Sequence, residues 1–292
     1  MSVVPVTVLS RDEWEPLARA HGERADAATA GHRNRAPRHE KHPVEDFLFE
    51  YYDTRPMRLR RWHPGIGVAL EDAPEHAAWR HYETHDGVTS LDPAAFWSAR
   101  ERTITYVEGL LRATASRPAR LGCFGLHEWA MVYRADADRR HLLPLRLGQA
   151  GTDAVVEATP IACSHFDAFR FFTPEAVPLN LLQPTRDTQI DLEQPGCLHA
   201  NMDLYRWAMK LVPGIPSAHE LEAFELALEI RRVDMRASPY DVSAYGLEAI
   251  PVETLEGKRQ YAELQGDFAT RGAILRSRIL TSLAALRSLL TP

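Results

Sequence analysis

The segment from Cys123 to Arg134 (CFGLHEWAMVYR) is apolar on nearly every side. Its large apolar side chains are Phe124, Leu126, Trp129, Met131, Val132 and Tyr133. A helix or strand of this composition has no free polar face, so it must lie inside the folded protein. His127 and Glu128, in its middle, therefore need polar partners in the interior.

Length and composition indicate an ordinary soluble globular protein. A chain of 292 residues can bury a sizeable core as one large domain or two smaller ones. Its hydrophobic content is 45% and its charged content 25%, both usual for that class. No stretch approaches the roughly 18 apolar residues of a membrane span, and the N-terminus meets charge too early for a signal peptide. We therefore expect a cytoplasmic protein with no membrane partner.

The three cysteines do not make a disulfide framework, so we expect a reducing compartment and no disulfide-linked partner. Each stands two or four residues before a histidine, a spacing that lets the pair share one face of a strand or helix. The pairs are Cys123 with His127, Cys163 with His165, and Cys197 with His199. Because no CxxC pair is present, small buried cysteines remain the alternative interpretation.

Hydrophobic periodicity predicts an α+β fold that is mostly α-helical, with a small β-hairpin or sheet near residues 141–170. The hairpin is predicted from two apolar runs, 142–147 and 153–158, that flank a turn beginning at Gly148. Helices are predicted from Val44 onward, over 96–114, over 199–211, from a capping box of Ser217 and Glu220 to about Met235, and over 256–290.

The charge pattern divides the chain into two regions. Residues 1–41 are predicted to be an N-terminal helix and a basic arm, and residues 42–292 a single globular, mainly helical catalytic domain. The arm carries Arg33, Arg35, Arg38 and Lys41. Such a run is usually solvated, although it can also contact phosphate. The overall net charge of −6 argues against a generally nucleic-acid-binding surface and leaves room for a local patch.

Four short stretches combine a histidine, a carboxylate and aromatic rings: residues 42–53, 127–133, 165–172 and 199–207. A site for a charged planar substrate, or for a metal beside one, needs proton-transfer groups and flat apolar walls together. In the first and fourth stretches a solvated helix face explains the polar positions equally well. The second and third lie in segments too apolar for that explanation.

Familiar catalytic motifs are absent. The sequence contains no GxGxxG, GxxxxGK[ST] or GxSxG motif. His127 and Glu128 begin an HExxH pattern, but Met131 stands where the second histidine would be. The zinc deaminase pattern is also missing.

Four segments together resemble a family of actinobacterial proteins carried under the name 3-methyladenine DNA glycosylase. They are GCFGLHEWAMVYR (122–134), CSHFDAFRFFTP (163–174), QPGCLHANMDLYRWAMKLVPG (194–214) and VDMRASPYDV (233–242). The resemblance covers nearly the whole chain. It implies a DNA-repair N-glycosylase that removes alkylated purines from DNA without a cofactor.

A glycosylase holds a flipped base between aromatic faces and uses a carboxylate to stabilise the sugar cation or activate water. The candidate catalytic residues are Glu128, Asp167, Asp203, His165 and His199. The candidate substrate-binding residues are Trp129, Tyr133, Phe169, Phe171, Trp207 and Arg170. A helix-hairpin-helix interpretation of residues 211–216, with Asp234 as catalytic carboxylate, is weakened because Pro216 replaces the second glycine of that hairpin.

Two other classes of function stay open. His127, His165 and His199, with carboxylates from the same stretches, could form a non-haem iron or zinc site that acts on a small molecule. Alternatively, the four stretches are packed core with satisfied polar groups, and the protein binds a partner without catalysis. Release of methylated purine from alkylated DNA, or a bound metal, would separate these classes.

Overall fold

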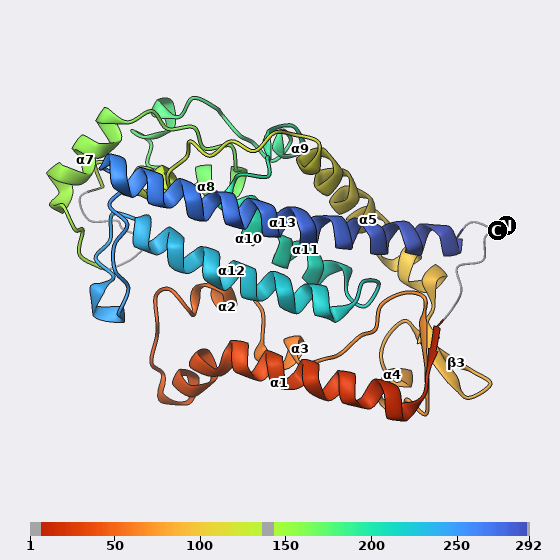
Figure 1. Cartoon of the computed structure of the whole chain (residues 1–292). Coiled ribbons are helices and arrows are strands. Elements are labelled where there is room, and N and C mark those ends of the chain that lie inside the picture. The colour runs from red at the N-terminus through yellow and green to blue at the C-terminus, as the bar shows by residue number, and fades with distance from the viewer. Residues whose placement is uncertain (1–6, 136–142, 291–292) are drawn as a thin grey trace.

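The computed structural model describes residues 7–135 and 143–290, and it confirms a mainly helical α+β fold (Figure 1). The four long helices are α1 (Arg11–Arg35), α5 (Pro93–Ala115), α12 (Ser217–Ala237) and α13 (Leu255–Leu290). The shorter ones are α2 (Phe47–Tyr51), α3 (Pro56–Leu59), α4 (Pro74–Ala77), α6 (Leu126–Ala130), α7 (Gly148–Ala158), α8 (Phe166–Phe169), α9 (Gln189–Leu192), α10 (Leu198–Met202) and α11 (Leu204–Leu211). Single 3₁₀ turns span Ala36–Arg38, Val177–Leu179 and Ser243–Tyr245. Within the described ranges, no helix is both long enough and apolar enough to cross a membrane.

Helix α12 is the central element of the core. It lies between α13 and α1 and also contacts α10 and α11 (Figure 1). Leu221, Phe224, Ala227 and Ile230 are buried along it at the three-residue spacing of one helix face. Because other helices cover its remaining sides, α12 also buries polar side chains, among them Arg231 and Asp234.

The sheet is small and lies near the N-terminal end of α1 (Figure 1). Its strands are β1 (Thr7–Leu9), β2 (Val68–Glu71), β3 (Tyr82–His85) and β4 (Val88–Leu91), in the order β1-β2-β4-β3. Strand β1 pairs parallel to β2, whereas the other two pairings are antiparallel. Asp86 and Gly87, both at positive φ, make the β3–β4 turn.

The predicted location of the β-structure is wrong. Residues 148–158 form helix α7, and the preceding run makes only one bridge, between Leu145 and Tyr240. The first residue of that run, Leu142, lies outside the described residues. Gly148 has φ 63° and starts a helix instead of closing a hairpin, so the valines that suggested a strand pack as a helical face. Short apolar runs do not distinguish the two structures by periodicity alone.

The predicted basic arm and the first cluster meet at the end of α1. That helix continues to Arg35, whose guanidinium contacts Glu45 at 2.8 Å and Asp46 at 2.6 Å. Asp46 is buried and also accepts a hydrogen bond from the backbone N–H of His42. The predicted helix from Val44 begins only at Phe47, and Asp46 is not part of a solvated face.

Helix α12 begins at Ser217 as predicted, but the predicted capping box is wrong. The hydroxyl of Ser217 accepts the backbone N–H of His63 at 2.9 Å, which ties the helix start to a distant loop. Glu220 does not reach back to the helix start. Its side chain is buried, and its Oε1 has no hydrogen-bond partner among the described residues.

The buried Glu220 should make stability depend on pH. Burial raises its pKa to about 7 from a usual 4.5, so the folded state holds the proton more tightly than the unfolded chain does. The wild type should therefore lose stability as pH rises from about 4.5 to about 7. Glu220→Gln cannot ionise and should gain about 3 kcal/mol relative to the wild type over that window. Urea unfolding at about pH 5 and about pH 8 measures this gain. The exposed Glu263→Gln serves as control, and an equal pH response of both variants would refute the assignment.

Candidate functional site

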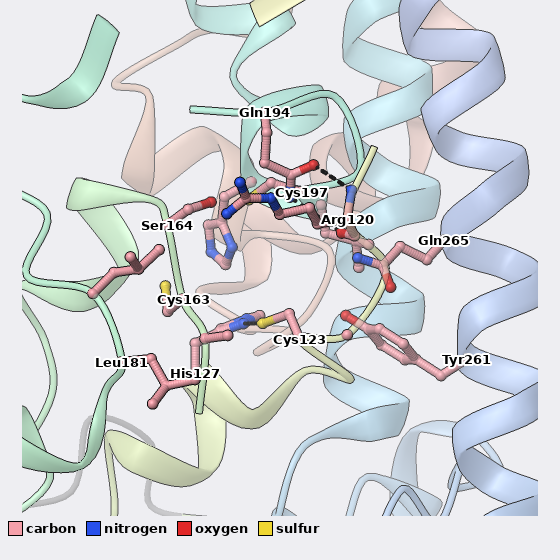
Figure 2. Close-up of a pocket in the computed structure, with 15 residues that line it drawn as sticks. Arg120, Cys123, His127, Cys163, Ser164, Leu181, Gln194, Cys197, Tyr261 and Gln265 are labelled. Atoms are coloured by element: carbon pink, nitrogen blue, oxygen red, sulfur yellow. Dashed lines mark hydrogen bonds between the residues drawn. The ribbon is translucent and has the colours of Figure 1, made fainter. Parts of the chain in front are cut away.

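Residues from five separated segments enclose a cavity of about 300 Å³ (Figure 2). Its lining includes Arg120, Cys123, His127, Cys163, Ser164, Cys197, His199, Tyr261 and Gln265. All three cysteines of the chain and two of the predicted histidines thus line one space. At its edge, the side-chain oxygen of Gln194 accepts the backbone N–H of Arg120 at 2.9 Å.

His127 reaches the cavity wall through a tight turn before α6. Phe124 and Gly125 both have positive φ, at 47° and 71°, so the chain reverses just before the helix begins. A Cβ at Gly125 would lie 3.4 Å from the ring of Tyr261, and a side chain there would also be strained at this φ. Glycine therefore lets α6 pack closely against α13.

A buried ion cluster holds His127 from behind. Its Nε2 lies 2.9 Å from Oδ1 of Asp234, and the guanidinium of Arg231 donates to Oδ2 of Asp234 at 2.9 Å and to Glu128 at 2.7 Å. All four residues are at most 4% exposed. Burial by itself lowers the pKa of His127, but the Asp234 carboxylate outweighs it and raises that pKa well above its usual value.

His199 stands beside His127 and has a different character. The two rings are nearly perpendicular, with centroids 4.5 Å apart. The ring of His199 makes no hydrogen bond to any residue that the structure describes. Burial, and then the neighbouring positive charge of His127, lower the pKa of His199 well below its usual value. An uncharged imidazole with free nitrogen atoms is therefore available at the cavity.

His127, His199 and Asp234 fit a metal ion. Each offers one ligand atom, and these atoms all lie within 4.8 Å of one another. The 2.9 Å between His127 Nε2 and Asp234 Oδ1 also matches the roughly 3 Å between neighbouring ligands whose bonds to a cation are about 2.1 Å long. Two histidines and one carboxylate are the donor set of non-haem iron enzymes and of several zinc hydrolases.

The Cys123 thiol faces the same imidazole from the other side. Its Sγ lies 3.5 Å from Nδ1 of His127, whose Nε2 faces Asp234. Cys123 and His127 thus meet, but the turn at Phe124 and Gly125 brings them together and not the predicted shared helix face, because α6 begins only at Leu126. Cys163, in contrast, contacts the backbone carbonyl of His165, with 3.7 Å between Sγ and O, and not its ring.

His165 does not line the cavity, and its ring centroid lies 5.4 Å from that of His199. Its Nε2 is 3.6 Å from a carboxylate oxygen of Glu193 and 3.6 Å from one of Asp203. Neither ring nitrogen has a hydrogen-bond partner among the described residues. Although burial lowers the pKa of His165, Asp203 and Glu193 raise it overall. The third predicted histidine thus belongs to a neighbouring ion cluster.

The predicted carboxylates do not share one place. Glu128 binds Arg231, and Asp203 lies between His165 and the hydroxyl of Tyr52, which donates to it at 2.7 Å. Asp203 is fully buried, so the solvated-face interpretation of the fourth cluster is wrong. The predicted helix over 199–211 breaks there into α10 and α11.

Asp167 is buried under arginines. Its carboxylate is contacted by Arg170 at 3.0 Å, by Arg186 at 3.3 Å and by Arg206. None of these residues lines the cavity. The predicted catalytic Asp167 and substrate-binding Arg170 thus form a separate ion cluster.

The aromatic residues predicted as walls do not line the cavity. Trp129 donates to the carbonyl of Ala237, and Tyr133 donates to Glu157. Phe169 is partly buried and packs against the core, Phe171 carries Arg170 on its face, and Trp207 packs against Tyr106. The ring at the cavity is Tyr261, which sequence reasoning missed. The phenylalanines and tryptophans of these apolar segments pack against the protein core because burying their large apolar surfaces contributes most to the stability of the fold.

Sequence reasoning also missed how Arg231 and Asp234 act together. Their spacing of three residues on a predicted buried helix was the available signal. Residues 211–216 connect α11 to α12, and Asp234 is buried. The helix-hairpin-helix interpretation therefore lacks the accessible carboxylate that it needs for catalysis on DNA.

The predicted family membership stays a prediction, because the chain matches no protein-family model, no curated protein and no solved structure.

Proposed function

We propose that the protein is an enzyme that binds a divalent metal ion through His127, His199 and Asp234 and acts on a small, mainly apolar molecule in the adjoining cavity. One observation carries this proposal. Ligand atoms from three distant segments lie within 4.8 Å of one another, and two of the three residues line the cavity. A cavity of about 300 Å³ is of the size that holds small ligands.

The surrounding residues support this role. Arg231 holds one oxygen of Asp234 and so orients the other toward His127. The cavity is lined largely by carbon and sulfur atoms, which favours apolar substrates and limits water. A metal bound there would supply a Lewis acid, and it would activate water or dioxygen according to its identity. Zinc or iron suits this mixture of imidazole, carboxylate and nearby thiol.

A thiol-dependent reaction is the second candidate. The order Cys123, His127, Asp234 places a nucleophile, a base and an orienting carboxylate in sequence, with distances of 3.5 Å and 2.9 Å. In this reading His127 is the proton acceptor of the Cys123 thiol. The two candidates use His127 differently, so they can be separated.

The glycosylase prediction receives less support from the geometry. A flipped base needs flat rings and a carboxylate around one open pocket. The predicted rings lie elsewhere, and the predicted carboxylates are paired with cationic side chains. Release of methylated purine from alkylated DNA by the purified protein remains the direct test of that prediction.

Elemental analysis and metal titration test the metal site. We expect near-stoichiometric zinc, iron or manganese in protein purified without chelators. His199→Ala should weaken metal binding at least about 100-fold, because it removes a direct ligand. This variant is the sharpest one, since the His199 ring makes no hydrogen bond within the described part of the chain and its loss leaves no described partner unpaired. Asp234→Asn should act in the same direction.

Two controls complete the experiment. His85→Ala removes an exposed histidine and should leave metal binding unchanged. Cys123→Ala should retain the metal if the three proposed ligands suffice. Protein that neither contains nor binds these metals would refute the metal site. Selective alkylation of Cys123 with loss of activity would then favour the thiol reaction.

A further inference from the structure

A second hollow, of about 940 Å³, lies where α1, α3 and α4 meet the turn between α11 and α12. In Figure 1 this is the side of the molecule formed by α1, with α3 and α4 beside it. It shares no lining residue with the cavity at His127. We call it the arginine groove, because six arginines line it: Arg55, Arg58, Arg60, Arg61, Arg80 and Arg100.

The charge of the arginine groove contrasts with that of the whole chain. The protein has a net charge of −6, yet among the lining residues only Glu75 and Glu220 carry acidic groups. Arg60 is paired with Asp26, which lies outside the lining. Arg58 and Arg100 donate to the backbone carbonyls of Met209 and Lys210, which leave their charge in place. The positive charge that remains along the groove attracts anions. A planar guanidinium group donates two parallel hydrogen bonds to two oxygens of one phosphate or carboxylate, whereas a lysine ammonium group acts as a point charge.

Flat rings stand beside these charges. Trp62 and Trp79 line the groove and are half-buried. The ring of His76 packs against both, with centroid distances of 5.9 Å to Trp62 and 4.4 Å to Trp79, and so holds their orientation. Arg61 lies over the Trp79 ring at 5.9 Å. The groove therefore offers a fixed aromatic surface next to cationic groups.

A buried carboxyl group with an unpartnered oxygen also lines the groove. Glu220 is 2% exposed, and its Oε1 has no hydrogen-bond partner in the described ranges. The nearest cationic atom is Nε of Arg58, 3.8 Å away, which is beyond hydrogen-bond distance. Buried polar atoms normally have hydrogen-bond partners. The unpartnered oxygen beside the groove therefore indicates a hydrogen bond that a bound ligand would supply.

We infer that the arginine groove binds a small phosphorylated ligand with a planar ring, of the nucleotide class. The arginines hold the phosphate groups, Trp79 and Trp62 contact the ring, and Glu220 makes a hydrogen bond to a polar group of the ligand. The arginines converge on one groove instead of extending over a long face, which favours a small ligand over a nucleic-acid strand. This inference does not depend on the proposed metal site.

Calorimetric titration with ADP tests the inference. The experiment uses the full chain in low-salt buffer with EDTA, so that no metal ion takes part. ADP should bind, and Arg61→Gln and Arg80→Gln should each weaken binding about 10-fold, the effect of losing one charge-assisted hydrogen bond. Arg259→Gln is the matched control, because this exposed arginine pairs with Glu256 on α13, and it should leave binding unchanged. His199→Ala should also bind ADP normally, which separates this site from the metal site.

Two further titrations identify the ligand class. Inorganic pyrophosphate should bind at least about 5-fold more weakly than ADP, because it lacks a ring to stack. Equal binding of the two would refute the role of the tryptophans. A thymidine oligonucleotide that binds while ADP does not would overturn the small-ligand assignment in favour of a strand. Absence of ADP binding, or equal loss in the Arg259→Gln control, would also overturn the proposal.

Discussion

Arg231→Gln is expected to lower the free energy of unfolding by about 3–5 kcal/mol, the usual result of breaking a buried ion pair by removing one partner. Arg231 is 1% exposed and donates to both Glu128 and Asp234. Burial alone lowers its pKa, but the two carboxylates raise it overall, so the guanidinium stays charged. Without it, the buried carboxylates of Glu128 and Asp234 lose the cation that they share. Glutamine keeps most of the volume, so the loss is electrostatic rather than a packing defect.

Urea unfolding at neutral pH measures this effect, and Arg271→Gln is the matched control. Arg271 also binds a carboxylate twice, contacting Glu229 at 2.7 Å and 2.8 Å, but its side chain is 39% exposed. Exposed pairs contribute about 0–1 kcal/mol. Similar losses of unfolding free energy in both variants would contradict the explanation that burial makes the ion pairs of Arg231 contribute more than exposed ones. We also expect Arg231→Gln to weaken metal binding, because Asp234 loses the group that orients it.

Asp203→Asn is expected to destabilise the protein by about 3 kcal/mol at neutral pH. The carboxylate is fully buried and lies near two cationic side chains, 3.5 Å from Arg206 and 3.6 Å from His165. Although burial raises the pKa of Asp203, Arg206 and His165 lower it overall. Asparagine has the same shape but no charge, so the positive charges of His165 and Arg206 lose a counter-ion.

The pH dependence of this loss follows from the direction of the shift. A carboxyl group with a lowered folded-state pKa contributes stability above its unfolded value, 3.8, and that contribution disappears as pH falls through the folded value. The difference between wild type and Asp203→Asn should therefore be complete near pH 7 and shrink below about pH 4.

Tyr52→Phe provides the comparison for Asp203. It removes only the hydroxyl that donates to the carboxylate at 2.7 Å, and it should cost about 1.5–3 kcal/mol. Chemical denaturation between about pH 3 and pH 7 measures both variants. A pH-independent loss in Asp203→Asn would show that the side chain acts through packing and not through its charge.

The pKa shifts of the three neighbouring histidines alternate in direction. The pKa is raised at His127 and His165, which face carboxylates, and lowered at His199 between them. Adjacent positive charges in a buried site repel each other, so the middle ring stays neutral. Since a metal ion competes with the proton on His127, metal binding at the proposed site should release a proton.

Much of the helical framework could be predicted from local pattern. The segments 96–114, 217–235 and 256–290 have a helical period over many residues, and each became a long helix with bounds within a few residues of the prediction. The burial of residues 123–134 also followed from composition, because a segment apolar on every side has no stable place at the surface. The same argument required inner partners for His127 and Glu128.

Other features needed the three-dimensional structure. Residues 148–158 are helical although their valines favour a strand, because α7 packs against α6, a contact that local sequence does not encode. Asp203 has the spacing of a solvated helix position, yet the break between α10 and α11 buries it against Tyr52. A periodic pattern identifies a face, but it does not say which segment covers that face.

The sequence by itself determined the helical class, the buried histidine segment and the presence of three histidines with nearby cysteines. Only the tertiary structure decided that His127 and His199 meet Asp234, while His165 is turned toward Glu193 and Asp203. The physical reason is that helical period and apolar content are properties of neighbouring residues. The partner of a buried charge, in contrast, is chosen by the packing of α6, α10 and α12, which are far apart along the chain.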